Sequence, residues 1–196
     1  MSVQPLEQED EARANFYALL AQLFYAPPEP DFLTSLARAE AVVDDGGGSP
    51  LASAWRDLAH SAAGATAQAV REEYESVFVG TGRAEVTLYT GAYTLNSALD
   101  NPLVQIRDFL SAQGLQRKQS VHEPEDHIAA LCEVMRHLVV RGDVAMQRDF
   151  FEGFVWPASG PLCAAILEHP RVTFYGDAAK FAKRFFELEH DAFQMD

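Results

Sequence analysis

The chain has 196 residues, of which 48% are apolar, and it carries a formal net charge of −14 with a sequence pI near 4.7. A globular protein of this size buries roughly 70% of its unfolded surface. The charge argues against nucleic acid and anionic membrane surfaces as partners, since both require a basic face, and it favours a cationic partner.

The cysteine content and the first residues of the chain bear on the cellular compartment in which the protein works. Two cysteines, Cys132 and Cys163, are too few for a disulfide framework and suggest a reducing environment. The first residues are acidic, where a secretory signal would be basic and then apolar. We also expect no run of the roughly 20 apolar residues that a membrane span requires. These features predict a cytoplasmic protein with no stable membrane insertion.

Apolar residues in the first part of the chain recur at the spacing of amphipathic helices. They predict helices near residues 16–24, 31–43, 51–58 and 70–78. The proline-rich stretch "APPEP" ends the first of them, because proline interrupts the helical backbone bonding. The glycine-rich stretch at 44–50 is predicted to be a flexible connection.

Residues 79–98 show no helical period, and their glycines and threonines weaken a helix. The stretch "EVTLY" within them is a candidate strand, but no second strand of comparable strength is available to pair with it. We therefore predict one long ordered loop, and loops of this length are often functional.

The second half of the chain returns to helical spacing. A helix near 103–110 is predicted to end at Gly114 in a left-handed conformation, and a second flexible connection is expected at 114–123. Further helices are predicted near 146–154, 162–167 and 174–188. The fold class is all-α, a single-domain helical bundle over residues 1–196.

A helix predicted to begin at Pro124 combines ordinary helix signals with an acidic and imidazole-rich edge. Proline suits the first helical position, and Glu125 and Asp126 place negative charge at the positive end of the helix dipole. The following apolar residues define a buried stripe made of Ile128, Leu131, Met135 and Leu138.

Ligand-type side chains near this helix do not have the spacing of a metal site. The group comprises His122, Glu125, Asp126, His127, Cys132 and His137. The H-E-x-x-H and C-x-x-C patterns are absent, and Glu133 with His137 would not fill a tetrahedral shell. We predict no metal ligand.

The sequence also offers no catalytic constellation. Both cysteines are expected to be small buried hydrophobic residues, and no nucleophile elbow, Walker loop or Rossmann fingerprint is present. We predict no enzyme activity, no catalytic residue and no cofactor, and a binding protein for a basic and partly apolar segment. A nucleotide- or cofactor-binding protein acting through "GTGR" at 80–83 is an alternative.

Four segments resemble the TorD/DmsD family of cytoplasmic chaperones for molybdoenzyme maturation. They are "EPEDHIA" at 123–129, "EYESVFVG" at 73–80, "LYTGAY" at 88–93, and the stretch from "FVWPASGPL" to "FFELE" at 154–189. The resemblance that they mark extends over most of residues 13–190, with the segments in the family's order.

The resemblance implies an all-helical domain without catalytic activity. Such a chaperone binds the twin-arginine signal peptide of an exported molybdopterin oxidoreductase, its apo-enzyme, or both, until the cofactor is inserted. Carried over by position, the peptide-binding residues are Tyr74, Val77, Phe78, Gly80, Tyr89, Glu123, Pro124, Asp126 and His127. The carboxylates would oppose the arginines of the client, and the aromatic rings would cover its apolar segment.

Several alternatives stay open at this point. Val77 and Phe78 lie on a helical stripe, so they can belong to the core alone. The chain departs from some relatives at Gly82, Thr87, Leu88 and Tyr89, which bears on the choice of peptide and of client. The chaperone can contact only the mature part of its client, and it can work as a monomer or a homodimer.

Overall fold

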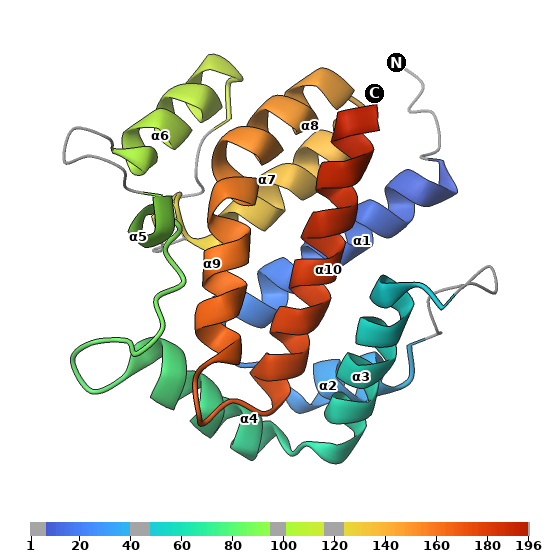
Figure 1. Ribbon diagram of the computed structural model, residues 1–196, viewed down its shortest axis with the longest axis vertical. Helices are drawn as coiled ribbons and strands as arrows, with labels where there is room; N and C mark the ends of the chain where they lie inside the picture. The colour runs from blue at the N-terminus through green and yellow to red at the C-terminus, as the bar shows by residue number, and fades with distance from the viewer. Residues whose placement is uncertain (1–6, 40–47, 95–100, 116–123, 196) are drawn as a thin grey trace. The chain divides into compact units, whose positions relative to one another are not determined.

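The structure is a computed structural model that describes residues 7–39, 48–94, 101–115 and 124–195 (Figure 1). Its helices, in chain order, are α1 (Gln8–Tyr25), α2 (Pro30–Ala37), α3 (Pro50–Gly64), α4 (Ala67–Tyr74), η1 (Glu75–Val79), α5 (Gly91–Thr94), α6 (Pro102–Ala112), α7 (Ile128–Arg141), α8 (Val144–Phe150), η2 (Phe151–Val155), α9 (Trp156–Leu167) and α10 (Phe174–Met195). The elements η1 and η2 are π-helical turns. No strand occurs within these described ranges, which confirms the all-α prediction.

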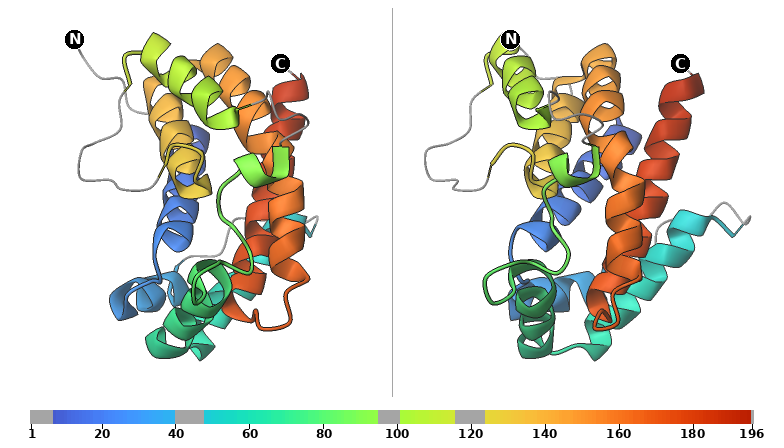
Figure 2. Two further views of the ribbon diagram at one scale, coloured as in Figure 1. Left: turned by 90° about the vertical axis from the view of Figure 1, so that its left-hand side faces the viewer. Right: turned by 60° about the vertical axis from the view of Figure 1, so that its left-hand side comes forward.

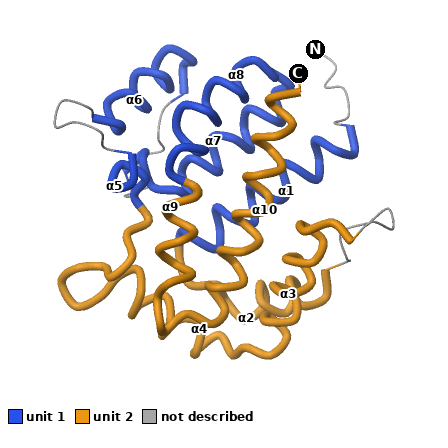
Figure 3. The backbone as a smooth tube through the Cα atoms, in the orientation of Figure 1, with its two compact units in different colours: residues 1–25, 89–158 blue, residues 26–88, 159–196 orange. Residues whose placement is uncertain are grey.

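The chain forms two compact units, each assembled from two separate stretches of sequence (Figure 3). Unit 1 contains residues 1–25 and 89–158, and unit 2 contains residues 26–88 and 159–196. The single domain over residues 1–196 stays a prediction. The glycine-rich connection falls mainly outside the described residues, as does nearly all of the connection at 114–123.

The core of unit 1 is built on α1 and α7, which pack along each other (Figure 2). The predicted stripe of α7 is confirmed, because Ile128, Leu131, Met135 and Leu138 are all fully buried. Helix α6 joins this unit through Phe109, whose ring contacts Phe150 and Phe154 with centroid distances of 5.1 and 5.7 Å.

Unit 2 is organised around α10, which packs on α3 and α4, while α2 packs on α3. Trp55 of α3 meets Phe181 of α10 with ring centroids 5.3 Å apart. The predicted apolar stripe of α10 is confirmed at Phe174, Phe181 and Phe185, but Leu188 is 53% exposed and does not belong to it.

Residues Val144–Leu167 form one continuous helix where the sequence predicted two. The π-helical turn η2 lies in its middle, and the boundary between the units falls within it. By length and composition alone this helix is apolar enough to cross a membrane, contrary to the expectation of no such run. Of this apolar stretch, 44% is buried within the protein, and the core helix of a soluble protein can satisfy the same test, so the finding is only weak evidence for a membrane span.

Two predicted boundaries are wrong. The second helix ends at Ala37 rather than near residue 43. Helix α7 begins at Ile128 rather than at Pro124, since residues 124–127 form a turn in which the His127 N–H donates to the Pro124 carbonyl (3.1 Å). The loop predicted at 79–98 is confirmed over residues 80–90 but is wrong at 91–94, which form the short helix α5, and residues 95–98 lie outside the described part of the chain.

Candidate functional site

In unit 1, the turn at 124–127 is bonded to the segment 89–91, although Thr90 and Asp126 are 36 positions apart in the sequence. Tyr89 and His127 form an isolated antiparallel bridge. The Asp126 carbonyl accepts hydrogen bonds from both the N–H and the hydroxyl of Thr90, at 2.8 and 2.9 Å. These bonds explain why the helix starts late, because the carbonyl of Asp126 is occupied by a distant residue.

The Asp126 side chain is half-buried and lies against Gly91. Burial raises the pKa of its carboxyl above the ordinary value of 3.8, although the backbone N–H groups of Gly91 and of Asp126 itself act in the opposite direction. A Cβ atom on Gly91 would lie 3.0 Å from Oδ2 of Asp126, so a side chain there would displace the carboxylate. Sequence reasoning quoted the "LYTGAY" segment but missed this role of Gly91.

His127 is buried and acts as the N-cap of α7. Its Nδ1 accepts a hydrogen bond from the Ala129 N–H (3.2 Å), so the neutral ring carries its proton on Nε2. The ring of Tyr89 meets that of His127 edge to face with centroids 5.2 Å apart, and Tyr89 remains 37% exposed. His127 therefore supports Tyr89, and Tyr89 presents an aromatic surface to solvent.

Glu125 lies beside Asp126 and pairs with Arg107 of α6. The distances from Nε and Nη2 of Arg107 to Oε2 of Glu125 are 3.0 and 2.9 Å. Pro124 is half-buried at the start of the turn. Glu123 lies outside the described residues.

The four other predicted residues are in unit 2, on α4, η1 and the loop that follows. The rings of Tyr74, Phe78 and Tyr175 form a cluster with centroid distances between 5.0 and 5.6 Å. Tyr74 and Phe78 are 7% and 8% exposed, and Val77 is fully buried. In this structure the three residues are part of the core of unit 2, and their contact with a peptide stays a prediction.

Gly80 ends η1 in a left-handed conformation with φ of +65°. A Cβ atom at this position would overlap the carbonyl oxygen of Arg83, so the turn requires glycine. The loop returns to η1, because the Val77 carbonyl accepts from the N–H groups of Glu85 and Val86, both at 3.0 Å. This closed loop carries the "GTGR" sequence at its tip, and nucleotide binding there stays a prediction.

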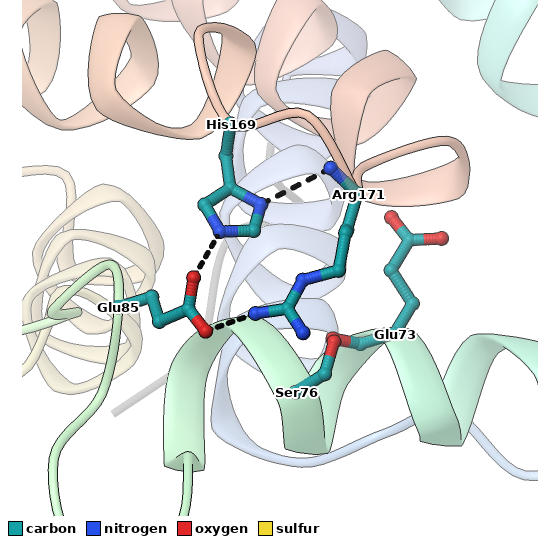
Figure 4. Close-up of polar contacts among 5 residues, drawn as sticks. All are labelled: Glu73, Ser76, Glu85, His169 and Arg171. Atoms are coloured by element: carbon teal, nitrogen blue, oxygen red, sulfur yellow. Dashed lines mark hydrogen bonds and ion pairs between the residues drawn. The ribbon is translucent and has the colours of Figure 1, made fainter.

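Two carboxylates of unit 2, Glu73 and Glu85, bind the segment that precedes α10 and the start of that helix, and Figure 4 shows the contacts of Glu85. Glu85 accepts a hydrogen bond from His169 Nε2 at 2.8 Å and pairs with Arg171, and these contacts lower the pKa of its carboxyl below the usual 4.5. The Arg171 N–H donates to His169 Nδ1, which places the proton of a neutral ring on Nε2.

Glu73 is buried, and its carboxylate caps the start of α10. It accepts hydrogen bonds from the N–H groups of Thr173, Phe174 and Tyr175 and from the Thr173 hydroxyl, at 2.6–3.1 Å. Sequence reasoning missed Glu73 and Glu85, since nothing in 29 acidic residues distinguishes two whose partners lie about a hundred positions later.

The structure thus brings Tyr89, Pro124, Asp126 and His127 together in unit 1, and Tyr74, Val77, Phe78 and Gly80 together in unit 2. A cavity of about 470 Å³ lies between α2 and α3 in unit 2, and none of the eight predicted site residues that the structure describes lines it. Within the described ranges, no three His, Cys, Asp or Glu side chains gather as a metal site.

Both cysteines are buried, as predicted. Burial raises the pKa of the Cys163 thiol to about 12, so this thiol is not a nucleophile near neutral pH. Tyr89 has a partly exposed ring in the same unit as the carboxylates of Glu125 and Asp126. In general, an arginine can stack on such a ring and pair with such carboxylates.

A family model described as nitrate reductase delta subunit matches residues 44–164 of the chain. Among curated proteins, the chain is 26% identical over 147 residues to the chaperone protein TorD of a Classical Ogawa strain of Vibrio cholerae, covering 70% of this chain and 67% of the relative. The TorD protein of an El Tor Inaba strain is 25% identical over the same length.

Among solved structures, the fold is similar to that of an Archaeoglobus fulgidus protein proposed to be a redox enzyme maturation protein. The TM-score is 0.57 with 19% sequence identity, and the match covers 89% of this chain and 93% of that one. At this identity the similarity concerns the fold alone.

Proposed function

The chain belongs to the nitrate reductase delta subunit family, and on that premise we propose that it is a chaperone for the maturation of a redox enzyme. Its client is the precursor of an exported molybdopterin oxidoreductase, which it binds in the cytoplasm through the twin-arginine signal peptide, the apo-enzyme, or both. It holds the precursor until the cofactor is inserted, proofreads it before export, and catalyses no reaction itself.

The surface of unit 1 around Tyr89 and the turn at 124–127 is the observation that supports this proposal most directly. Arginine pairs with carboxylates in a charge-assisted way and also stacks on aromatic rings, and both kinds of group are present here. The net charge of −14 adds attraction toward a basic leader.

The free energies of the two kinds of contact, arginine–carboxylate pairs and apolar contacts, suggest different roles for them. A micromolar complex corresponds to about 8 kcal/mol, whereas an exposed arginine–carboxylate pair supplies only about 0.2–1 kcal/mol. The apolar part of the signal peptide therefore supplies most of the affinity, and the arginines contribute specificity.

Titration calorimetry with a synthetic peptide that carries two consecutive arginines followed by an apolar segment tests the proposal. We expect Tyr89→Ala to weaken binding about fivefold or more, because a central aromatic contact is lost. Tyr25→Ala is the matched control, since Tyr25 is an exposed tyrosine at the end of α1 in the same unit. Absence of binding to any twin-arginine peptide would remove the signal-peptide form of the proposal.

Contact with the mature part of the client is a separate form of the same function. A pull-down with a precursor that lacks its leader distinguishes the two, since only a chaperone that recognises the mature enzyme retains it.

A further inference from the structure

In the turn at 124–127, called the acidic turn below, Glu125 already has an arginine partner within the chain. Arg107 of α6 places Nε and Nη2 within 3.0 Å of the same carboxylate oxygen. The side chain of Glu125 is only 14% exposed, whereas that of Arg107 is 51% exposed.

This pair differs from an ordinary surface ion pair of the same unit. In the pair between Arg136 and Glu133 on α7, the side chains are 49% and 55% exposed, so water can solvate either charge. A mostly buried carboxylate such as Glu125 needs a counter-charge, because an uncompensated charge in such a position is strongly unfavourable. Arg107 supplies that counter-charge from a side chain that is itself about half exposed to solvent.

We propose that Arg107 binds the Glu125 carboxylate while no client is bound, and that an arginine of the client takes its place on Glu125 in the complex. This inference rests on the proposed function. The exchange replaces one guanidinium by another, so Glu125 keeps a partner throughout, and the released Arg107 side chain moves into solvent. A lysine is a weaker competitor, because its ammonium lacks the planar fork that binds a carboxylate.

The test is a double-mutant cycle measured by calorimetry with the same twin-arginine peptide and with a second peptide in which both arginines are glutamine. We expect R107Q to tighten binding of the arginine peptide about twofold to fivefold, because no internal competitor remains. R136Q is the matched control, since it removes an arginine from an exposed pair in the same unit, and it should leave affinity within about 1.5-fold. In the E125Q background, the gain from R107Q should vanish.

If R107Q binds no more tightly than R136Q, or gains as much in the E125Q background or with the glutamine peptide, Arg107 does not compete through Glu125. In that case wild-type binding of the arginine peptide still supports the proposed function. If neither the wild type nor R107Q binds the arginine peptide, the signal-peptide function and this inference fail together.

A measurement on the wild type covers the case in which R107Q does not fold. The Arg107 Nε–H donates to Glu125 in the free chain, so its NMR signal should be protected from exchange with water. Addition of the arginine peptide should remove this protection, whereas the glutamine peptide should not. Protection that persists in the saturated complex would overturn the proposal.

Discussion

At the scale of single residues, Asp126 is a carboxyl whose ionisation opposes folding. Burial raises its pKa above 3.8, so the folded chain holds the proton more tightly than the unfolded chain does. Stability therefore declines as the pH rises through the interval between 3.8 and the folded pKa. We expect Asp126→Asn to be at least as stable as the wild type at pH 7, because an amide oxygen still accepts from Gly91, and to lose that advantage near pH 3. Urea unfolding followed by circular dichroism from pH 3 to pH 7 measures the difference.

Asp149→Asn is the control for this experiment, since Asp149 is an exposed aspartate on α8 in the same unit. Its difference from the wild type should change little over the same range. If Asp126→Asn instead loses stability relative to the wild type as the pH rises, the charge on Asp126 strengthens its contact with Gly91 by more than burial costs.

At the scale of secondary-structure elements, Glu73 of α4 holds the start of α10. Replacing it with alanine leaves three backbone N–H groups and the Thr173 hydroxyl without their acceptor. We expect Glu73→Ala to lower the free energy of unfolding by roughly 2–4 kcal/mol, and Glu73→Gln to cost less because one oxygen remains. Glu72→Ala is the neighbouring control, since Glu72 is exposed and its carboxylate accepts a hydrogen bond from Gln68 of the same helix, and it should change stability by less than about 0.5 kcal/mol. Equal effects at the two positions would show that the cap contributes nothing.

The helices themselves were predictable because their signal is local. The stripe from Ile128 to Leu138 depends only on residues three and four positions apart, and the structure buries every member of it. The same holds for the proline-rich end of α1 and for the left-handed glycine after α6, Gly114, whose φ is +66°.

The sequence-based predictions were wrong mainly where contacts with residues far away in the sequence determine the local structure. Helix α7 begins late because the Asp126 carbonyl is bonded to Thr90, and no pattern near Pro124 contains that information. The continuous helix 144–167 was predicted as two helices, 146–154 and 162–167, and the stretch between them contains Pro161, a helix-breaking residue that nevertheless lies inside α9. For the site, the motif located the turn at 124–127, whereas the burial of Tyr74 and Phe78 and the pairing of Glu125 with Arg107 depend on tertiary contacts.

At the scale of the whole molecule, 29 acidic residues against 15 basic ones give the chain a net negative charge of −14. Such a charge accelerates the approach of a cationic segment, and salt screens it over a distance of about 10 Å at 0.1 M. We expect an increase from about 50 to 500 mM NaCl to weaken binding of the twin-arginine peptide about threefold to tenfold, mainly through a slower association rate. Stopped-flow fluorescence measures the association and dissociation rates separately.

The peptide with glutamine in place of both arginines is the control and should be nearly insensitive to salt, because its contacts are apolar. If both peptides respond equally to salt, or if the loss lies in faster dissociation, the charge of the molecule does not steer the client, and the contacts at the acidic turn alone account for the preference for arginine.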